Sequence, residues 1–265
     1  MIHSFRRQFL YELKSVLFGY PGFVYFDLGV SSIPVFVYHT IEPKIFESHL
    51  AYLRNNNYRT LSIHEYSNQL NREPVNNKFV LITIDDARSS VWRYAFPLLK
   101  KYGMNASVFV IPGFTIETNE CRDNLFDVWN GKKNMEQIRN IDPEDNTLCT
   151  WQEILSMYKS GLINIESHTL FHREIFKSTK IVDYIIPERE VTPYNFNGSP
   201  YLSNSDIGKE LNPDEYIGLP LFESAPLMLA GPRLNISPEF KAKCKEIYNY
   251  YNLLSLSKVV SFIHT

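Results

Sequence analysis

This 265-residue chain contains two adjacent carboxylates, Asp85 and Asp86, whose side chains could take part in acid-base chemistry or bind a metal. They close an apolar run that starts at Phe79, and such a run is typical of a strand buried on both faces. Ionised carboxylates at the end of a buried strand are costly unless a cation or hydrogen-bond donors face them. The pair therefore indicates either a functional site or a loop that caps the next helix, and the run alone does not decide between these interpretations.

A pair of histidines follows another predicted strand. His168 and His172 lie four residues apart, a spacing that puts both imidazoles on one face of a helical turn. Two neutral imidazoles and one carboxylate form a common catalytic zinc set, with an open position for water. Neighbouring residues on a strand point in opposite directions, so one aspartate of the pair is expected to bind the metal and the other to reach the water. The histidine spacing alone is weak evidence, and its conjunction with the two acids is what supports a metal site.

Two further histidines, His39 and His264, close strand-like runs over 34–39 and 258–264. The carboxyl ends of strands are where α/β barrels and open parallel sheets bind their ligands. A lone histidine is nonetheless more often a hydrogen-bonded core or surface residue. Neither histidine is assigned to the site on its position alone.

The elements that must position these side chains alternate between strand and helix. Such alternation predicts parallel βα units. Asp85 would then lie at the same edge of the sheet as the residues that follow the other strands. The predicted strands are 34–39, 59–63, 79–84, 106–111 and 162–167, and the predicted helices are 45–55, 64–71, 89–102 and 150–161.

The remainder of the chain is less regular. We expect an N-terminal extension over 1–32 and one domain over 33–265. A polar stretch over 118–146 is predicted to be an insertion. A Pro-rich region over 180–238 is predicted to be irregular, either covering the mouth of the sheet or forming an inserted subdomain. A helix is expected over 239–251.

The composition narrows the class of protein. A net charge of −2 shows no basic excess for nucleic acid, and no apolar tract is long enough for a membrane span. Glu12 and Lys14 interrupt the apolar N-terminal stretch, so we expect no signal peptide, and at most weak surface attachment through an amphipathic helix over 5–18. Three cysteines without metal-type spacing indicate reduced thiols and a cytoplasmic location.

Between about Ile33 and Arg173 the motifs resemble, in order and spacing, those of NodB-type polysaccharide deacetylases. The resemblance covers just over half of the chain. Its motifs are Pro34-Val-Phe-Val-Tyr-His39, Tyr58-Arg-Thr-Leu-Ser62, Thr83-Ile-Asp-Asp86, Phe96-Pro-Leu-Leu-Lys-Lys-Tyr-Gly103 with Ala106-Ser-Val-Phe-Val110, and Ser167-His-Thr-Leu-Phe-His172.

This resemblance implies an α/β fold, a distorted (β/α) barrel that is incomplete if no elements follow Thr265. It also implies metal-dependent hydrolysis of N- or O-acetyl groups on an oligosaccharide, polysaccharide or sugar-linked precursor. Asp85 matches the family's catalytic base, which takes a proton from the attacking water. Asp86, His168 and His172 match its ligands to a divalent metal, with zinc expected.

The sequence departs from the family's pattern in several places. Ala87 replaces a glycine and Arg173 replaces a proline, both mild changes. An arginine that orients the base is missing before Tyr201, and the nearest alternative is Arg233. His264 fits the family's proton-donating histidine only loosely. These departures keep open a catalytically degenerate member that binds metal and carbohydrate without turnover.

Two other enzyme classes fit less well. A phosphatase of the haloacid type needs an Asp-x-Asp sequence, whereas Asp85 and Asp86 are adjacent. A glycosidase needs two carboxylates on either side of the scissile bond, which would leave the histidine pair without a role. Substrate specificity is expected in the stretches over 118–146 and 187–238, which the resemblance does not cover.

Overall fold

The computed structural model describes residues 33–70, 78–185, 200–209 and 212–252. The N-terminal extension and the strand-like run that ends at His264 lie outside these residues. No helix in the described part of the chain is long and apolar enough to cross a membrane.

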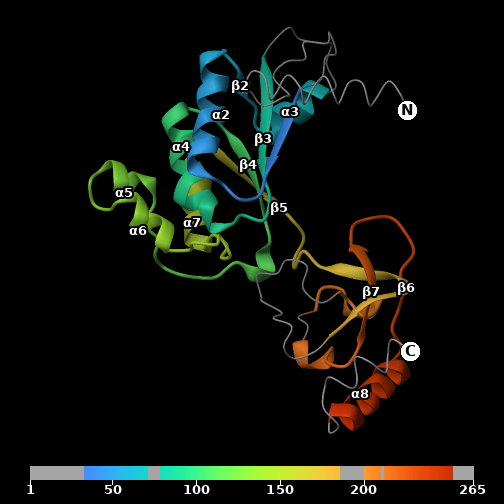
Figure 1. Cartoon of the computed structure of the whole chain (residues 1–265). Coiled ribbons are helices and arrows are strands. Elements are labelled where there is room, and N and C mark those ends of the chain that lie inside the picture. The colour runs from blue at the N-terminus through green and yellow to red at the C-terminus, as the bar shows by residue number, and fades with distance from the viewer. Residues whose placement is uncertain (1–32, 71–77, 186–199, 210–211, 253–265) are drawn as a thin grey trace, which may run out of the picture.

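Five parallel strands form the first sheet (Figure 1). The predicted α/β architecture of parallel βα units is confirmed. Among the described residues the sheet stays open, with β1 and β5 at its edges, which corresponds to part of the wall of the expected barrel. Its order is β1 (Val35–Tyr38), β3 (Phe79–Ile84), β4 (Ala106–Val110) and β5 (Ile163–Ser167), and β2 (Arg59–Thr60) pairs with the start of β3.

The central strand β3 is apolar on both faces because both faces are covered. Every residue from Val80 to Ile84 is buried. The three helices α2 (Pro43–Asn55), α4 (Phe96–Tyr102) and α7 (Trp151–Lys159) lie on one side of the sheet in Figure 1, and α3 (Ile63–Leu70) lies apart from them. The main hydrophobic core fills the space between the sheet and these helices.

The ends of these helices follow local sequence signals. Thr150 caps α7 through the predicted capping box with Glu153. Gly103 ends α4 with a left-handed φ of 62°, as a glycine at this position favours. The helix expected over 89–102 begins at Ser89 as predicted, passes through a π-helical turn over Val91–Ala95 and continues as α4.

The polar stretch over 118–146 contains two short helices, α5 (Leu125–Trp129) and α6 (Met135–Asn140). Each begins with a capping box on an asparagine, Asn124 and Asn134. The segment lies on the same side of the sheet as α7 (Figure 1).

A second sheet pairs the antiparallel strands β6 (Glu174–Tyr184) and β7 (Pro220–Pro226). The region expected to be irregular therefore contains strand structure. Most of β6 from Ser178 onward is exposed, so no alternation of apolar and polar residues marks it in the sequence. A separate core around Phe176 supports this sheet, and α8 (Pro238–Asn252) follows it.

Candidate metal centre and active site

The chain turns sharply at the adjacent acids. Asp85 still follows the sheet, since its N–H donates to the carbonyl of Tyr38 at 2.8 Å. Asp86 and Ala87 then adopt left-handed φ angles of 69° and 55°. Such angles cost a residue with a side chain roughly 1–2 kcal/mol each, so the family's glycine at position 87 has a physical reason that alanine must overcome here.

The turn places the two carboxylates in different surroundings. The Asp86 side chain is 4% exposed, and the Asp85 side chain is 20% exposed. The expectation that the two acids cannot share one role is consistent with this separation.

The two histidines are brought together by a strained turn instead of a helical one. His168 follows β5 and donates its N–H to the carbonyl of Val110 at 2.7 Å. Thr169 and His172 have left-handed φ angles of 65° and 47°, and the Thr169 hydroxyl accepts the N–H of His172. The two imidazole rings lie 4.6 Å apart between centroids. The predicted proximity is present, although its predicted helical cause is wrong.

A glycine lets this turn approach the sheet. The N–H of Gly113 donates to the carbonyl of Leu170 at 2.8 Å. A Cβ at position 113 would lie 2.3 Å from the Phe171 ring and 2.5 Å from that carbonyl. Any larger residue would therefore push the histidine turn away from β4.

Asp86, His168 and His172 converge on one point. One ligand atom from each lies within 4.8 Å of the others. Oδ1 of Asp86 is buried without a hydrogen-bond partner and lies 3.6 Å from Nε2 of His168. A buried carboxylate oxygen that faces imidazole nitrogens in this way suits a cation between them.

The electrostatics of His168 agree with this arrangement. Burial lowers the pKa of His168, and the neighbouring His172 lowers it further, while Asp85 and Asp86 oppose the shift. The neutral imidazole is the form that binds metals. The donor set therefore fits a divalent ion of the zinc type.

One histidine that the sequence placed at a strand end, without assigning it to the site, lies beside Asp85. Nε2 of His39 lies 3.7 Å from Oδ2 of Asp85. β1 and β3 are neighbours in the sheet, and Tyr38 pairs with Ile84, so the residues that follow these strands meet. The position of His39 at a strand end was visible in the sequence, but the sheet order that places it beside Asp85 was not.

The two remaining candidates are not brought to this point by the described residues. Arg233 is exposed and donates to Oδ1 of Asn204 at 3.1 Å and to the carbonyl of Leu227 at 3.3 Å. Both partners belong to the region around β6 and β7. His264 lies outside the described residues, so its expected role stays a prediction.

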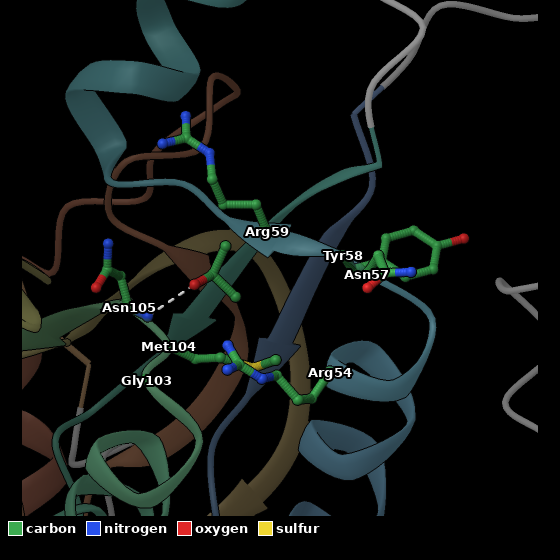
Figure 2. Close-up of a pocket in the computed structure, with 8 residues that line it drawn as sticks. Arg54, Asn57, Tyr58, Arg59, Gly103, Met104 and Asn105 are labelled. Carbon is green, nitrogen blue, oxygen red and sulfur yellow. Dashed lines mark hydrogen bonds between the residues drawn. The ribbon is translucent and has the colours of Figure 1, made fainter.

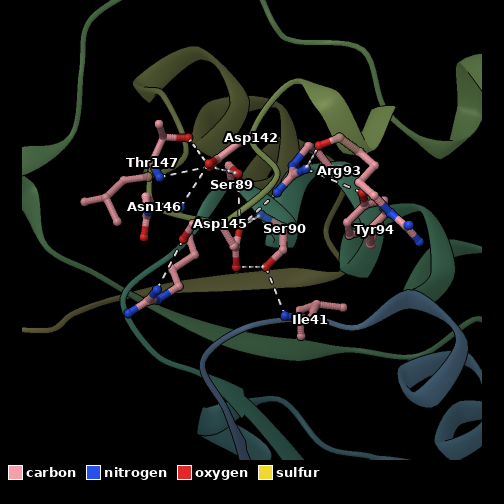
Figure 3. A network of polar contacts seen from close by, with 12 residues as sticks. Ile41, Ser89, Ser90, Arg93, Tyr94, Asp142, Asp145, Asn146 and Thr147 are labelled. Carbon is pink, nitrogen blue, oxygen red and sulfur yellow. Dashed lines mark hydrogen bonds and ion pairs between the residues drawn. The ribbon is translucent and has the colours of Figure 1, made fainter. Parts of the chain in front are cut away.

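A network of buried polar side chains braces the loop that follows the acids (Figure 3). Oδ2 of Asp142 accepts the Ser89 hydroxyl at 2.7 Å and the Thr147 hydroxyl at 2.6 Å. The Asp145 carboxylate accepts from Ser90 and from the Arg93 guanidinium. The end of the polar stretch over 118–146 is thus hydrogen-bonded to the residues that follow Asp85 and Asp86.

A hollow at the opposite end of the strands takes no part in this site (Figure 2). Thr60 lies in β2, and Asn105 directly precedes β4, whereas the acids and histidines follow strands. The N–H of Asn105 donates to the Thr60 hydroxyl at 2.7 Å. The hollow is lined by Arg54, Asn57, Tyr58, Arg59, Thr60, Gly103, Met104 and Asn105.

Comparison with known proteins gives the family. The polysaccharide deacetylase family profile matches residues 72–212, slightly more than half of the chain. The chain belongs to the polysaccharide deacetylase family. Asp85, Asp86, His168 and His172 lie inside the matched residues, and His39 and Arg233 lie outside them.

Relatives of this polysaccharide deacetylase family member carry matching names. YxkH of Bacillus subtilis (strain 168), whose name assigns it to the polysaccharide deacetylases, is 38% identical over 154 residues, which are 55% of this chain and 45% of YxkH. The poly-beta-1,6-N-acetyl-D-glucosamine N-deacetylase of Staphylococcus aureus (strain MRSA252) is 25% identical over 60% of this chain and 46% of its own length. The matches therefore span less than half of either relative.

A solved structure of IcaB from Ammonifex degensii is 27% identical, with a TM-score of 0.40, and the match covers 56% of each chain.

Proposed function

We propose that this chain is a metal-dependent deacetylase that hydrolyses N- or O-linked acetyl groups on a carbohydrate. The observation that carries the proposal is the convergence of Asp86, His168 and His172 beside Asp85 at the carboxyl ends of the parallel strands β3 and β5. Membership of the polysaccharide deacetylase family supports the same activity.

Asp86, His168 and His172 would hold a divalent ion. Zinc suits two neutral imidazoles and a carboxylate, and such an ion supplies Lewis acidity toward an acetyl carbonyl and lowers the pKa of water. The chain's own contribution is a buried carboxylate with one unsatisfied oxygen, together with a histidine kept neutral by burial.

Asp85 serves as the general base in this proposal. Its carboxylate is partly exposed, unlike that of Asp86, so it can reach a water molecule beside the bound acetyl group. It takes the proton from that water as the water oxygen attacks the acetyl carbon.

His39 serves as the proton donor. It lies 3.7 Å from Asp85, and its side chain is 58% exposed, so it can reach the leaving amine or alcohol of a sugar. The bond between the acetyl carbon and the leaving nitrogen or oxygen breaks, acetate is released, and His39 supplies the proton that the leaving group needs. In this proposal His39 takes the proton-donating role that the sequence suggested for His264.

The substrate class follows from the named relatives. The name of the Staphylococcus aureus relative states that it acts on poly-beta-1,6-N-acetyl-D-glucosamine. An acetylated amino-sugar polymer or oligomer is therefore the first substrate to test here. The cytoplasmic location predicted from the sequence stays a prediction.

A second candidate is a degenerate family member that binds metal and carbohydrate without turnover. Its supporting observation is Arg233, the nearest alternative that the sequence offered to orient Asp85, which bonds instead to Asn204 and Leu227. Arg233 therefore does not hold Asp85 in place for proton transfer.

One experiment separates the two candidates. The full chain is loaded with zinc and incubated with poly-beta-1,6-N-acetyl-D-glucosamine oligomers, and released acetate is measured. We expect release that falls by about 10²–10⁴-fold in Asp85→Asn, the range for loss of a general base. Bound zinc with no acetate release from the wild-type chain would support the degenerate member instead.

A further inference from the structure

The two carboxylate oxygens of the buried Asp86 side chain face different partners. Oδ1 lies 3.6 Å from Nε2 of His168. Oδ2 accepts Nε of Arg88 at 3.4 Å. One oxygen therefore points toward the histidine pair, and the other is occupied by a guanidinium from the loop that follows the acids.

Arg88 is anchored by the segment that precedes α7. Its backbone forms an antiparallel bridge with Leu148, and its carbonyl accepts the Cys149 thiol at 3.2 Å. On either side, the Ala87 carbonyl accepts the N–H of Cys149 at 2.7 Å, and the N–H of Ser89 donates to Thr147 at 2.8 Å. The backbone that carries the guanidinium is thus paired with a second strand of chain.

The guanidinium itself is also hydrogen-bonded to the backbone of Asp145. Nη1 of Arg88 donates to the Asp145 carbonyl at 3.2 Å. Asp145 has a left-handed φ of 53°, and its carboxylate is fixed by Ser89, Ser90 and Arg93 (Figure 3). These side-chain bonds hold the residue in a conformation that its backbone alone disfavours, which directs its carbonyl toward Arg88.

We propose that Arg88 is a positioning residue for the metal ligand Asp86. By occupying Oδ2, it fixes the rotation of the carboxylate and leaves Oδ1 to face His168 and a bound cation. The inference rests on the proposed function, because it takes Asp86 as a ligand. Groups that orient a metal ligand typically account for 10–100-fold in metal affinity or activity.

An ordinary surface ion pair does not explain this contact. Surface pairs contribute little, because both charges stay hydrated. The Asp86 side chain is 4% exposed and that of Arg88 is 23% exposed, so the carboxylate has little water to replace a lost partner. The planar guanidinium also reaches Asp86 and Asp145 at once through different nitrogens, which a lysine ammonium cannot reproduce with the same geometry.

The test is zinc affinity of the full chain, measured by competition with a chromogenic chelator. We expect Arg88→Gln to bind zinc about 10–100-fold more weakly than wild type. Arg88→Lys keeps the charge and is expected to recover less than half of that loss on a logarithmic scale. The matched control is Arg59→Gln, an exposed arginine at the opposite end of the strands (Figure 2), which should bind zinc as wild type does.

Wild-type affinity in Arg88→Gln would overturn the role of Arg88 and leave the metal site standing. Absence of zinc binding by the wild-type chain would overturn both. If Arg88→Gln does not fold, Arg88→Lys loaded with Co²⁺ provides the test through its visible ligand-field spectrum. A spectrum that differs from that of the wild-type cobalt protein is expected, and an identical spectrum would overturn the inference.

Discussion

The parallel sheet brings its candidate site residues together, whereas the two-stranded sheet does not. In the parallel sheet, the carboxyl ends of β1, β3 and β5 lie at the same edge, so side chains that follow these separate strands meet there. In the antiparallel pair of β6 and β7, the carboxyl ends of the two strands lie at opposite ends of the sheet. Arg233 donates a hydrogen bond to Asn204 in the same region. Residues far apart in sequence converge where the topology gives them a common edge.

The first test of this comparison substitutes the proposed proton donor His39 and, separately, Arg233 beside the two-stranded sheet. We expect His39→Gln to lower kcat of the zinc-loaded chain by about 10²-fold, because the leaving group loses its acid. Arg233→Gln should lower kcat by less than about threefold, a change that corresponds to well under 1.4 kcal/mol. Acetate release under saturating substrate measures both variants. A larger loss of kcat in Arg233→Gln than in His39→Gln would place the acid-base chemistry near β6 and β7 and contradict the comparison.

The packing of the histidine turn offers a second test. Gly113→Ala should destabilise the chain by about 1–3 kcal/mol, since the new methyl group must displace Phe171 and the Leu170 carbonyl. Gly231→Ala, near β7, meets nothing within 4 Å and should change the free energy of unfolding by less than about 0.5 kcal/mol. Urea unfolding measures both. Equal effects would show that the turn is not closely packed on the parallel sheet.

The buried network behind the acids predicts a smaller, pH-dependent effect. Burial raises the pKa of Asp142, but hydrogen bonds from Thr147, Ser89 and Asn146 outweigh burial and lower it to about 2. Because the folded state holds the carboxylate ionised, this stabilisation is present above the unfolded pKa near 3.8 and is lost as the pH falls toward 2.

Asp142→Asn should therefore remove up to about 2 kcal/mol of the decrease in unfolding free energy between pH 5 and pH 2. Urea titrations at several pH values measure this slope. The control is Asp214→Asn, an exposed aspartate in the short 3-10 turn over Pro213–Glu215, whose slope should match that of wild type. An unchanged slope in Asp142→Asn would contradict the account of the network.

Much of the parallel sheet could be predicted from the sequence because its signals are local. The buried run before Asp85, the capping box at Thr150 and the stop at Gly103 each depend on a few neighbouring residues. Asp86, His168 and His172 could be paired by the chemistry of their side chains and by the family motifs around them.

The remainder depended on contacts that no local pattern encodes. His39 meets Asp85 only because β1 pairs with β3, and Arg88 meets Asp145 across 57 residues of chain. The histidine turn could not be distinguished from a helical one, since no sequence signal marks the left-handed angles at Thr169 and His172 or the contact of this turn with Gly113. The strand β6 was missed because exposure removes the apolar alternation that marks a half-buried strand.

The most direct test of the metal centre is a zinc titration of the full chain by calorimetry. We predict one zinc ion per wild-type chain, retained in Asp85→Asn, because the base is not a ligand. In His172→Ala, affinity should fall by more than about 100-fold, since a ligand is lost outright. Absence of zinc binding by the wild-type chain, or equal affinity in His172→Ala, would contradict the proposed metal centre.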